Sequence, residues 1–349
     1  MKKKKIIVLM GGPSSEHEVS LNTGKEVIRN LDRHKYVADP VVITRDGNWL
    51  MPTGKKTLSG KTAVIPKKGG RTLVLARQLA LKKVKAKKLD AVFIAMHGEF
   101  GEDGTIQGLL ESYGIPYTGS GILASALGMD KPRQAVLFRQ AGLKVPEFIV
   151  LQKSEWRKNK KRILADGIEN FSLPCVIKPA NRGSSVGVSI VKSRKEFAGA
   201  IRSAFSYSDL IMVQKFIRGR EITCGVLEGA AGKLHPMPPI EIMAKAGKFY
   251  DYQSKYAEGG SEHIIPPRNM PERLVKKIQD AACLAHNILG CRGMSRTDFI
   301  LQDDGSLHVL EINTLPGMTS TSLLPESART IGIDFSRLLD WIIKSALRK

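Results

Sequence analysis

The stretch "RTDFILQDDGSLHVLEINTLPG", residues 296–317, consists of two alternating runs joined by the turn residues "DDGS". This pattern predicts a β-hairpin. With the turn centred on the Asp-Gly pair, Asp298 lies opposite Glu311 and Arg296 lies opposite Asn313. All four side chains then share one face of the hairpin.

The second face of this hairpin is the expected core face. It carries Thr297, Phe299 and Leu301 against Leu310 and Ile312. A register slip of one residue would bury the charges and expose the phenylalanine, which argues for the register given above.

The charged face of the hairpin has the chemistry of a magnesium site. Asp298, Glu311 and Asn313 supply two carboxylates and an amide oxygen, which are the hard ligands that hold Mg²⁺ together with substrate phosphates. The alternative is a solvated strand edge. That alternative leaves two like charges facing each other, which is unfavourable unless a cation lies between them.

A phosphate site also needs an anion cradle, and "CVIKPANRGSSVGVS", residues 175–189, has this form. Lys178 ends an apolar strand, and the glycines of the following turn let backbone amides approach an anion closely. The segment is not a Walker A loop, because GxxxxGK[ST] is absent and a strand follows the glycines. A plain hairpin turn is the alternative for this segment alone. Joined to the acidic hairpin and to "QKFIRGRE", residues 214–221, it predicts a nucleotide site between two domains.

The chain of 349 residues is too long for one ordinary core. Strands alternate with helices over residues 1–128, which predicts a doubly wound parallel sheet. Residues 129–220 form a smaller block rich in hairpins, and residues 221–349 combine strands, a helix at 271–289, the acidic hairpin and a last helix from Asp334. The expected fold class is therefore mixed, α/β and α+β.

The net charge of +22 is uneven, since residues 47–89 contain twelve Lys and Arg and no acid. Such a field could hold nucleic acid or steer an anionic substrate. No aromatic platform accompanies the run, so a solvated surface is the favoured interpretation and no nucleic-acid partner is expected.

Cysteine usage and hydropathy bear on the compartment. The four cysteines have no CxxC spacing and lie in apolar stretches, which is typical of reduced core residues. The apolar run "IIVLM" is too short for a signal peptide, and no segment is long and apolar enough to span a membrane. We expect a cytoplasmic protein.

Seven segments, in this order, resemble the D-alanine–D-alanine ligases of the ATP-grasp superfamily over essentially the whole chain: "GGPSSEHEVSLNTG", "HGEFGEDGTIQGLLESYGIPYTGSG", "DKPRQAVLF", "KPANRGSSVGVS", "YDYQSKY", "RTDFIL" and "EINTLPGMTSTSLLP". The resemblance implies a three-domain ATP-grasp fold. It also implies a reaction in two steps, in which ATP phosphorylates the carboxylate of one D-alanine and the amine of a second attacks the acylphosphate. The family further suggests a homodimer formed through the N-terminal block.

The resemblance implies roles for residues around the two amino acids. Glu16 should bind the ammonium of the first D-alanine, and Ser184 and Tyr256 should form a hydrogen-bonded set with it. His97 and Lys255 should lie near the substrates, although His97 could equally be a satisfied core histidine.

The same resemblance implies which groups bind the second amino acid and which stabilise the negative charge that develops during the reaction. Arg296 and the Gly317 amide should stabilise the oxyanion. Ser322 and Leu323 should hold the second carboxylate.

The resemblance also implies a set of residues that would bind ATP and its metal ions. The phosphates would contact Lys131, Lys178, Ser184 and Lys215, the adenine strand would supply Gln214, Phe216 and Ile217, and the ribose would meet Glu221. Two Mg²⁺ ions, with Mn²⁺ as a possible substitute, would be held by Asp298, Glu311 and Asn313.

Some positions depart from the family pattern. Gln214 stands where an acid is frequent, Phe216 where tryptophan is common, and Arg182 where glutamate is frequent. These departures could alter nucleotide affinity.

The polar segment "YDYQSKYAEGGSEHI", residues 250–264, is an expected lid over the site. Its Lys255-Tyr256 pair resembles dipeptide-forming members and predicts D-alanine as the second substrate. Two alternatives stay open: a ligase that uses another acceptor, and a basic binding protein built on an inactive ligase fold.

Overall fold

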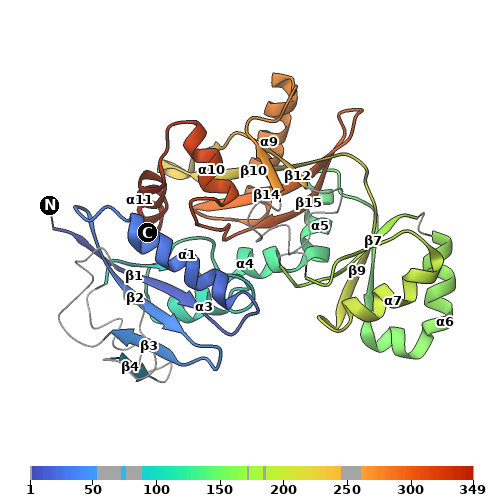
Figure 1. Cartoon of the computed structure of the whole chain (residues 1–349), viewed down its shortest axis with the longest axis horizontal. Helices are drawn as coiled ribbons and strands as arrows, with labels where there is room; N and C mark the ends of the chain where they lie inside the picture. The colour runs from blue at the N-terminus through green and yellow to red at the C-terminus, as the bar shows by residue number, and fades with distance from the viewer. Residues whose placement is uncertain are drawn as a thin grey trace.

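The computed structural model describes residues 2–52, 72–75, 89–170, 173–183, 186–244 and 261–348. Ser184, Lys255 and Tyr256, and most of the lysine-rich region, lie outside these residues. The described chain forms three sheets, which Figure 1 shows as an N-terminal sheet at one end, a sheet with β7 and β9 at the other, and a larger sheet between them.

The N-terminal sheet has the order β4-β3-β2-β1-β5. Its central strands, β1 (Lys4–Gly11), β2 (Tyr36–Ile43) and β5 (Ala91–Ile94), are parallel, as the sequence predicted. The segment "IPYTGS", residues 115–120, adds no regular strand and forms only an isolated parallel bridge between Val92 and Tyr117.

The remaining two strands of this sheet were not predicted. β3 (Trp49–Pro52) and β4 (Thr72–Leu75) pair antiparallel at its edge. Only a short turn joins β2 to β3, closed by a hydrogen bond from the Thr44 amide to the Asn48 carbonyl. A connection this short permits a hairpin but not a parallel crossover, so the sheet is parallel only at its centre.

Helices follow the strands of this block. α1 (His17–Asn30) packs so closely on β1 that a Cβ at Gly24 would lie 2.6 Å from Met10 Cε. α3 (Thr105–Ser112) and α4 (Ile122–Met129) follow β5, and α5 (Lys131–Gln140) begins at Asp130, whose side chain accepts a hydrogen bond from the Arg133 amide. The carboxyl ends of β1 and β5, where α/β sheets bind ligands, therefore meet at one edge.

The larger sheet has the order β13-β12-β10-β14-β15, with β11 paired to β10. Its bounds are β10 Arg220–Glu228, β11 Leu234–Pro236, β12 Ile240–Ala244, β13 Ser261–Ile264, β14 Met294–Leu301 and β15 Leu307–Asn313. The short 3₁₀ turn η1 (Ala230–Gly232) joins β10 to β11. The apolar side of α9 (Glu272–Leu289) packs on this sheet, close to the predicted range of 271–289.

The hairpin β14–β15 confirms the predicted register at its charged end. Asp298 pairs with Glu311, as predicted, but the register then shifts so that Phe299 pairs with Val309. This bulge inserts one residue, and Leu310, predicted to be in the core, is half-buried and lines a pocket on the charged face. The core face instead carries Val309 and Leu307 beside Phe299.

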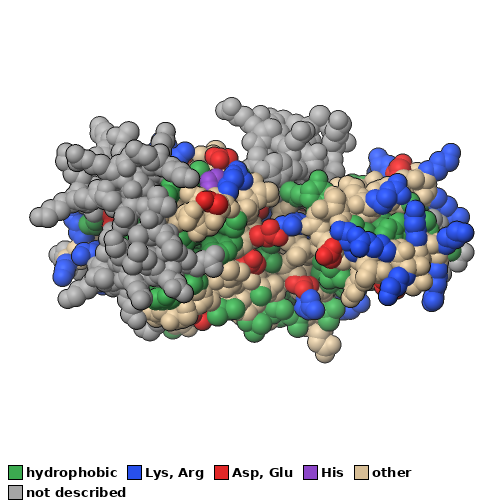
Figure 2. Space-filling view, turned by 90° about the horizontal axis from the view of Figure 1, so that it is seen from below, with side chains coloured by type: hydrophobic (Ala, Val, Ile, Leu, Met, Phe, Trp, Pro, Cys, Tyr) green, Lys and Arg blue, Asp and Glu red, His purple; other side chains and the backbone are tan. Residues whose placement is uncertain are grey.

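The smallest sheet, β6-β9-β7-β8, is antiparallel throughout. It comprises β6 (Phe148–Gln152), β7 (Cys175–Pro179), β8 (Ser189–Val191) and β9 (Leu210–Lys215). α6 (Lys153–Asn170), kinked at Asn159, and α7 (Arg194–Ala204) cover it around a core of their own. Figure 2 shows Lys and Arg side chains gathered at the end of the molecule formed by α6 and α7.

The N-terminal sheet shares its core with the C-terminal helices α10 (Leu323–Thr330) and α11 (Phe335–Ala346). α11 begins after Asp334, as predicted, and its Ile342 and Ile343 pack in the same apolar cluster as β1 and β5. Residues 1–128 and 221–349 are thus held together, and the proposed block boundaries stay a prediction. None of the described helices combines the length and the apolar character needed to cross a membrane.

A polar cluster fixes α11 to the N-terminal block. Asp340 accepts a hydrogen bond from the Tyr36 hydroxyl at 2.7 Å and contacts Lys344 at 2.8 Å and Lys35 at 3.3 Å. Burial raises the pKa of Asp340, but the hydrogen bonds from Lys344, Tyr36 and Lys35 lower it more, so the pKa lies below the ordinary value.

Replacing Asp340→Ala should lower the free energy of unfolding by about 1.5–3 kcal/mol at neutral pH, because hydrogen bonds to a charged group are lost. Since the pKa of Asp340 is depressed in the folded state, the difference from wild type should shrink as the pH falls below about 4. Urea unfolding across pH measures this. Asp280→Ala, which breaks an exposed pair with Lys276, is the matched control, and an equal loss in the control would contradict the prediction.

Candidate active site

Two connected hollows lie where the three sheets meet. A large cavity of about 470 Å³ lies between the edge of the N-terminal sheet and the β14–β15 hairpin, and a small pocket of about 100 Å³ lies between that hairpin and the sheet of β7 and β9. Lys131, Asp298 and Glu311 line both. Any molecule that spans the two must pass these three side chains.

The predicted site residues divide between these hollows. The large cavity is lined by Glu16, His97, Arg296, Asn313, Gly317, Ser322 and Leu323. The small pocket is lined by Lys178, Gln214, Lys215, Phe216, Ile217 and Glu221. The structure therefore brings together every predicted site residue that it describes, and Ser184, Lys255 and Tyr256 lie outside the described residues.

Glu16 is buried at the start of α1, immediately after the carboxyl end of β1. Two glycines make room for its carboxylate: a Cβ at Gly98 would lie 2.6 Å from Glu16 Oε2, and one at Gly183 would lie 3.3 Å away. Gly98 also has φ +73°, a conformation that favours glycine. Gly183 belongs to the glycine-rich turn, so that turn lies against Glu16.

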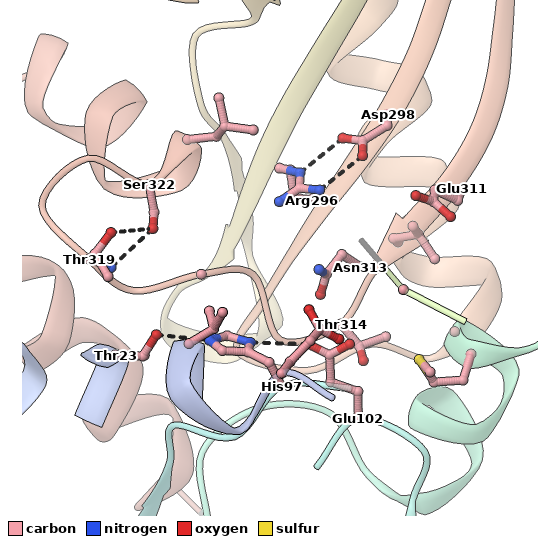
Figure 3. Close-up of a pocket in the computed structure, with 18 of the residues that line it drawn as sticks. Thr23, His97, Glu102, Arg296, Asp298, Glu311, Asn313, Thr314, Thr319 and Ser322 are labelled. Carbon is pink, nitrogen blue, oxygen red and sulfur yellow. Dashed lines mark hydrogen bonds and ion pairs between the residues drawn. The ribbon is translucent and has the colours of Figure 1, made fainter. Parts of the chain in front are cut away.

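His97 is buried behind the cavity wall and both of its ring nitrogens have partners (Figure 3). Nδ1 lies 3.2 Å from Glu102 Oε1, and Nε2 lies 2.9 Å from the Thr23 hydroxyl. Burial lowers the pKa of His97, but the hydrogen bond and charge of Glu102 raise it more, while burial raises the pKa of Glu102. The pair therefore keeps a proton to higher pH than either group alone would.

Arg296 and Asp298 form a two-pronged contact on the charged face of the hairpin (Figure 3). Arg296 Nε and Nη2 donate to the two carboxylate oxygens at 2.9 Å each. The Thr223 hydroxyl donates a further hydrogen bond to Asp298 at 2.6 Å. Such bidentate pairing fixes the plane of the guanidinium group and the direction of the carboxylate.

Glu311, opposite Asp298, is paired with Lys131 at 2.6 Å. The two like charges are therefore each balanced by a cation from the protein. Lys178 lies buried in the small pocket. Burial and the charge of Lys131 lower the pKa of Lys178 to about 8, while the charge of Glu311 opposes the shift.

Asn313 and Ser322 face the large cavity from opposite sides (Figure 3). Asn313 Oδ1 accepts a hydrogen bond from the Leu315 amide at 2.9 Å, which leaves that oxygen a second lone pair. Ser322 precedes α10, and its hydroxyl accepts from the Thr319 amide at 3.1 Å rather than capping the helix. The first amides of α10 thus have no side-chain cap from Ser322.

The small pocket is lined by both apolar and polar side chains. Val176, Ile300 and the bulged Leu310 supply apolar surface, and Gln214 is buried. Arg182, which departs from the family pattern, forms an ion pair with Glu99 and donates to the Tyr207 carbonyl at 2.8 Å. Arg182 therefore ties the glycine-rich turn to the loop after β5.

The donor set on the hairpin fits a hard divalent cation. The described residues hold no group of three or more His, Cys, Asp or Glu side chains arranged for a metal. Mg²⁺, however, is usually bound through one or two carboxylates with substrate phosphates and waters. Asp298, Glu311 and the second lone pair of Asn313 Oδ1 match that requirement.

Several lining residues had no signal in the sequence. Thr23 and Glu102 orient His97, and His263 lines the large cavity while it contacts Glu326. Thr23 and His97 lie 74 positions apart, and His263 and Glu326 lie 63 positions apart, so no local spacing could have indicated these two contacts. Glu102 lies only five positions after His97, but no motif pointed to that contact.

The Lys178 ammonium should titrate near pH 8 in the protein without nucleotide and metal, because burial disfavours its charged form. The variant Glu311→Gln should lower that midpoint further, since Glu311 favours the charge. NMR of the lysine Nζ and Cε signals across pH measures this, with Lys178→Arg to assign the signal. A midpoint at the ordinary value of 10.5 would contradict the prediction.

Known proteins are similar to this chain over nearly its whole length. The family described as "D-ala D-ala ligase N-terminus" matches residues 5–120, and "D-ala D-ala ligase C-terminus" matches residues 137–344. The D-alanine--D-alanine ligase of Geotalea uraniireducens is 43% identical over 100% of this chain and 97% of its own, and that of Pelotomaculum thermopropionicum is 39% identical over 98% and 96%.

Solved structures are similar over nearly the whole chain. The VanG D-Ala:D-Ser ligase from Enterococcus faecalis has a TM-score of 0.82 at 35% identity and covers 99% of this chain and 100% of that one. The Bacillus anthracis D-alanine--D-alanine ligase complexed with ATP has a TM-score of 0.76 at 33% identity, covering 99% and 98%. The chain therefore belongs to the D-Ala–D-Ala ligase family and has the ATP-grasp fold of its structural neighbours.

Proposed function

We propose that this chain joins two D-alanine molecules at the expense of ATP, giving D-alanyl-D-alanine, ADP and phosphate for cell-wall precursor synthesis. One observation carries the proposal: Lys131, Asp298 and Glu311 line both the small pocket and the large cavity. A nucleotide in the pocket would place its terminal phosphate beside these residues, where it would meet a carboxylate in the cavity.

In the first step the γ-phosphoryl group passes from ATP to the carboxylate of the donor D-alanine. This forms a D-alanyl phosphate and releases ADP. Glu16, buried at the cavity wall, would bind the donor ammonium and so orient the carboxylate toward the phosphate. The hydrogen-bonded pair of His97 and Glu102 also lines the cavity and would hold the His97 ring in one position near the substrate.

In the second step the amine of the acceptor D-alanine attacks the carbonyl carbon of the acylphosphate. A C–N bond forms, the amine loses a proton, and phosphate leaves with the electrons of the C–O bond. Arg296, fixed in orientation by Asp298, and the Gly317 amide would stabilise the oxyanion. Donors held in place before the reaction lower the barrier because they need no reorganisation as charge develops.

The acceptor carboxylate would bind at the N-terminus of α10 through Ser322 and the Leu323 amide. Helix N-termini attract anions because their first amides lack intrahelical partners. The roles of Ser184, Lys255 and Tyr256 stay predictions.

ATP would occupy the small pocket with its base on the apolar lining. Gln214, Phe216 and Ile217 would contact the adenine, Glu221 the ribose, and Lys131, Lys178 and Lys215 the phosphates. A pKa near 8 leaves Lys178 largely protonated at neutral pH, and phosphate would favour that charged state further.

Two Mg²⁺ ions, or Mn²⁺ in their place, would be held by Asp298, Glu311 and Asn313. Such ions neutralise charge that develops on the transferred phosphoryl group. In their presence Lys131 could turn from Glu311 toward the substrate phosphates.

Turnover with defined acceptors tests this function. Phosphate release from Mg·ATP should require D-alanine, and mass spectrometry should find the D-alanyl dipeptide, while L-alanine should give none. D-Serine and D-lactate are informative because a similar structure is a D-Ala:D-Ser ligase. Turnover that needs one of these acceptors would overturn D-alanine as the second substrate, and silence with every acceptor would overturn the ligase activity.

We also propose a homodimer formed through residues 1–128. Ile122 and Leu123 on α4 are large apolar side chains with 43% and 70% of their surface exposed, and exposed apolar patches often mark interfaces. Sedimentation of Leu123→Glu against wild type would test this.

We also propose a cytoplasmic location, where ATP is available. No nucleic-acid partner is proposed.

A further inference from the structure

His263 lies on the edge strand of the larger sheet and reaches the large cavity. It belongs to β13 and pairs across the strand with Ile242 of β12, and both side chains line the cavity. Ser322 and Leu323, at the start of α10, line the same cavity, and Leu323 packs against the cluster of Ile240 and Ile242. His263 therefore lies at the proposed acceptor end of the cavity, whereas Glu16 precedes α1 and His97 follows β5.

The imidazole of His263 is fixed through both ring nitrogens. Nδ1 lies 2.5 Å from Glu326 Oε2, and Nε2 lies 3.1 Å from the Ser261 hydroxyl. The side chains of His263 and Glu326 are only 20% and 22% exposed. A short contact between largely buried polar groups holds both side chains in one geometry.

Glu326 belongs to the first turn of α10. Its amide donates to the Ser322 carbonyl at 2.9 Å, so it lies one turn after the residue that begins the helix. The contact with His263 therefore joins the edge strand to the same turn of α10 that would receive the acceptor carboxylate.

We infer that His263, oriented by Glu326, is a positioning residue for the acceptor amino acid, a role that rests on the proposed ligase function. The pair holds the wall formed by β13 against the first turn of α10. This fixes the distance between the Ser322–Leu323 end of the cavity and the strand that faces it, and so fixes where the acceptor carboxylate and amine lie.

Other contacts hold α10 in the fold. The positioning role of the His263–Glu326 contact can therefore be tested without unfolding the helix. The Ser327 hydroxyl donates to the Pro238 carbonyl at 2.6 Å, and Arg329 donates to the Ser320 carbonyl at 2.7 Å. Leu324 and Ala328 are buried in the core shared with the N-terminal sheet. Loss of the His263–Glu326 contact should therefore leave α10 folded while its first turn loses its tie to β13.

Alternation along β13 supplies a matched control. Glu262 precedes His263 and so points to the opposite face of the strand. It forms an exposed ion pair with Arg268 at 2.9 Å. A change at Glu262 perturbs the same strand without touching the cavity.

The test measures the initial rate of the full chain with Mg·ATP as a function of D-alanine concentration. Because D-alanine binds at two sites, the rates yield two Michaelis constants, one for the donor site and one for the acceptor site. His263→Phe and Glu326→Leu should each raise the acceptor constant by about tenfold, as expected for a lost hydrogen bond to a charged group. The donor constant and the KM for ATP should change by less than about twofold. The double variant should be no worse than either single variant, because both remove one contact.

Glu326→Gln, which keeps an oxygen that can accept from the imidazole, should restore most of the acceptor affinity. Glu262→Gln should match wild type, and thermal unfolding should show that every variant is folded. Equal shifts in both amino-acid constants, additive effects in the double variant, or an unchanged acceptor constant would each overturn the inference. Failure of wild type to turn over D-alanine would instead overturn the proposed function.

Discussion

The site depends on one electrostatic constraint, the direct opposition of Asp298 and Glu311 across the β14–β15 pair. Two carboxylates at this spacing repel each other, and the protein balances them with Arg296 on one side and Lys131 on the other. Lys131 begins α5 and Arg296 belongs to β14. The two ion pairs therefore connect α5 to the β14–β15 hairpin where the pocket and the cavity adjoin. Divalent cations bound with substrate phosphates could replace these two ion pairs without a large change in the net charge of the site.

The rest of the fold fixes the position of this junction relative to the proposed amino-acid site. The C-terminal helices share one core with the N-terminal sheet, so Glu16 and His97 are held at a fixed distance from Arg296. The smallest sheet has a separate core, and it supplies Lys178 and Gln214 to the small pocket. Under the proposed function, the molecule combines an amino-acid site built on one shared core with a separately packed wall for ATP.

Sequence reasoning found the hairpin register because a turn signal and an alternating pattern agreed on one pairing. It placed Leu310 wrongly because a bulge adds a residue without changing the hydrophobic pattern. It missed β3 and β4 because the lysine-rich segment around them lacks alternation. It also missed the tie between His263 and Glu326, since contacts between polar residues 63 positions apart leave no local pattern.

If Asp298 and Glu311 need a cation when nucleotide is bound, nucleotide affinity must depend on Mg²⁺. Calorimetric titration with a non-hydrolysable ATP analogue, with and without Mg²⁺, measures this dependence. In wild type Mg²⁺ should tighten binding by about tenfold or more, since it relieves repulsion between carboxylates and phosphates. In Asp298→Asn/Glu311→Gln the metal-free affinity should be unchanged or higher and the effect of Mg²⁺ should largely vanish. The same Mg²⁺ dependence in both proteins would show that the two carboxylates do not hold the cation.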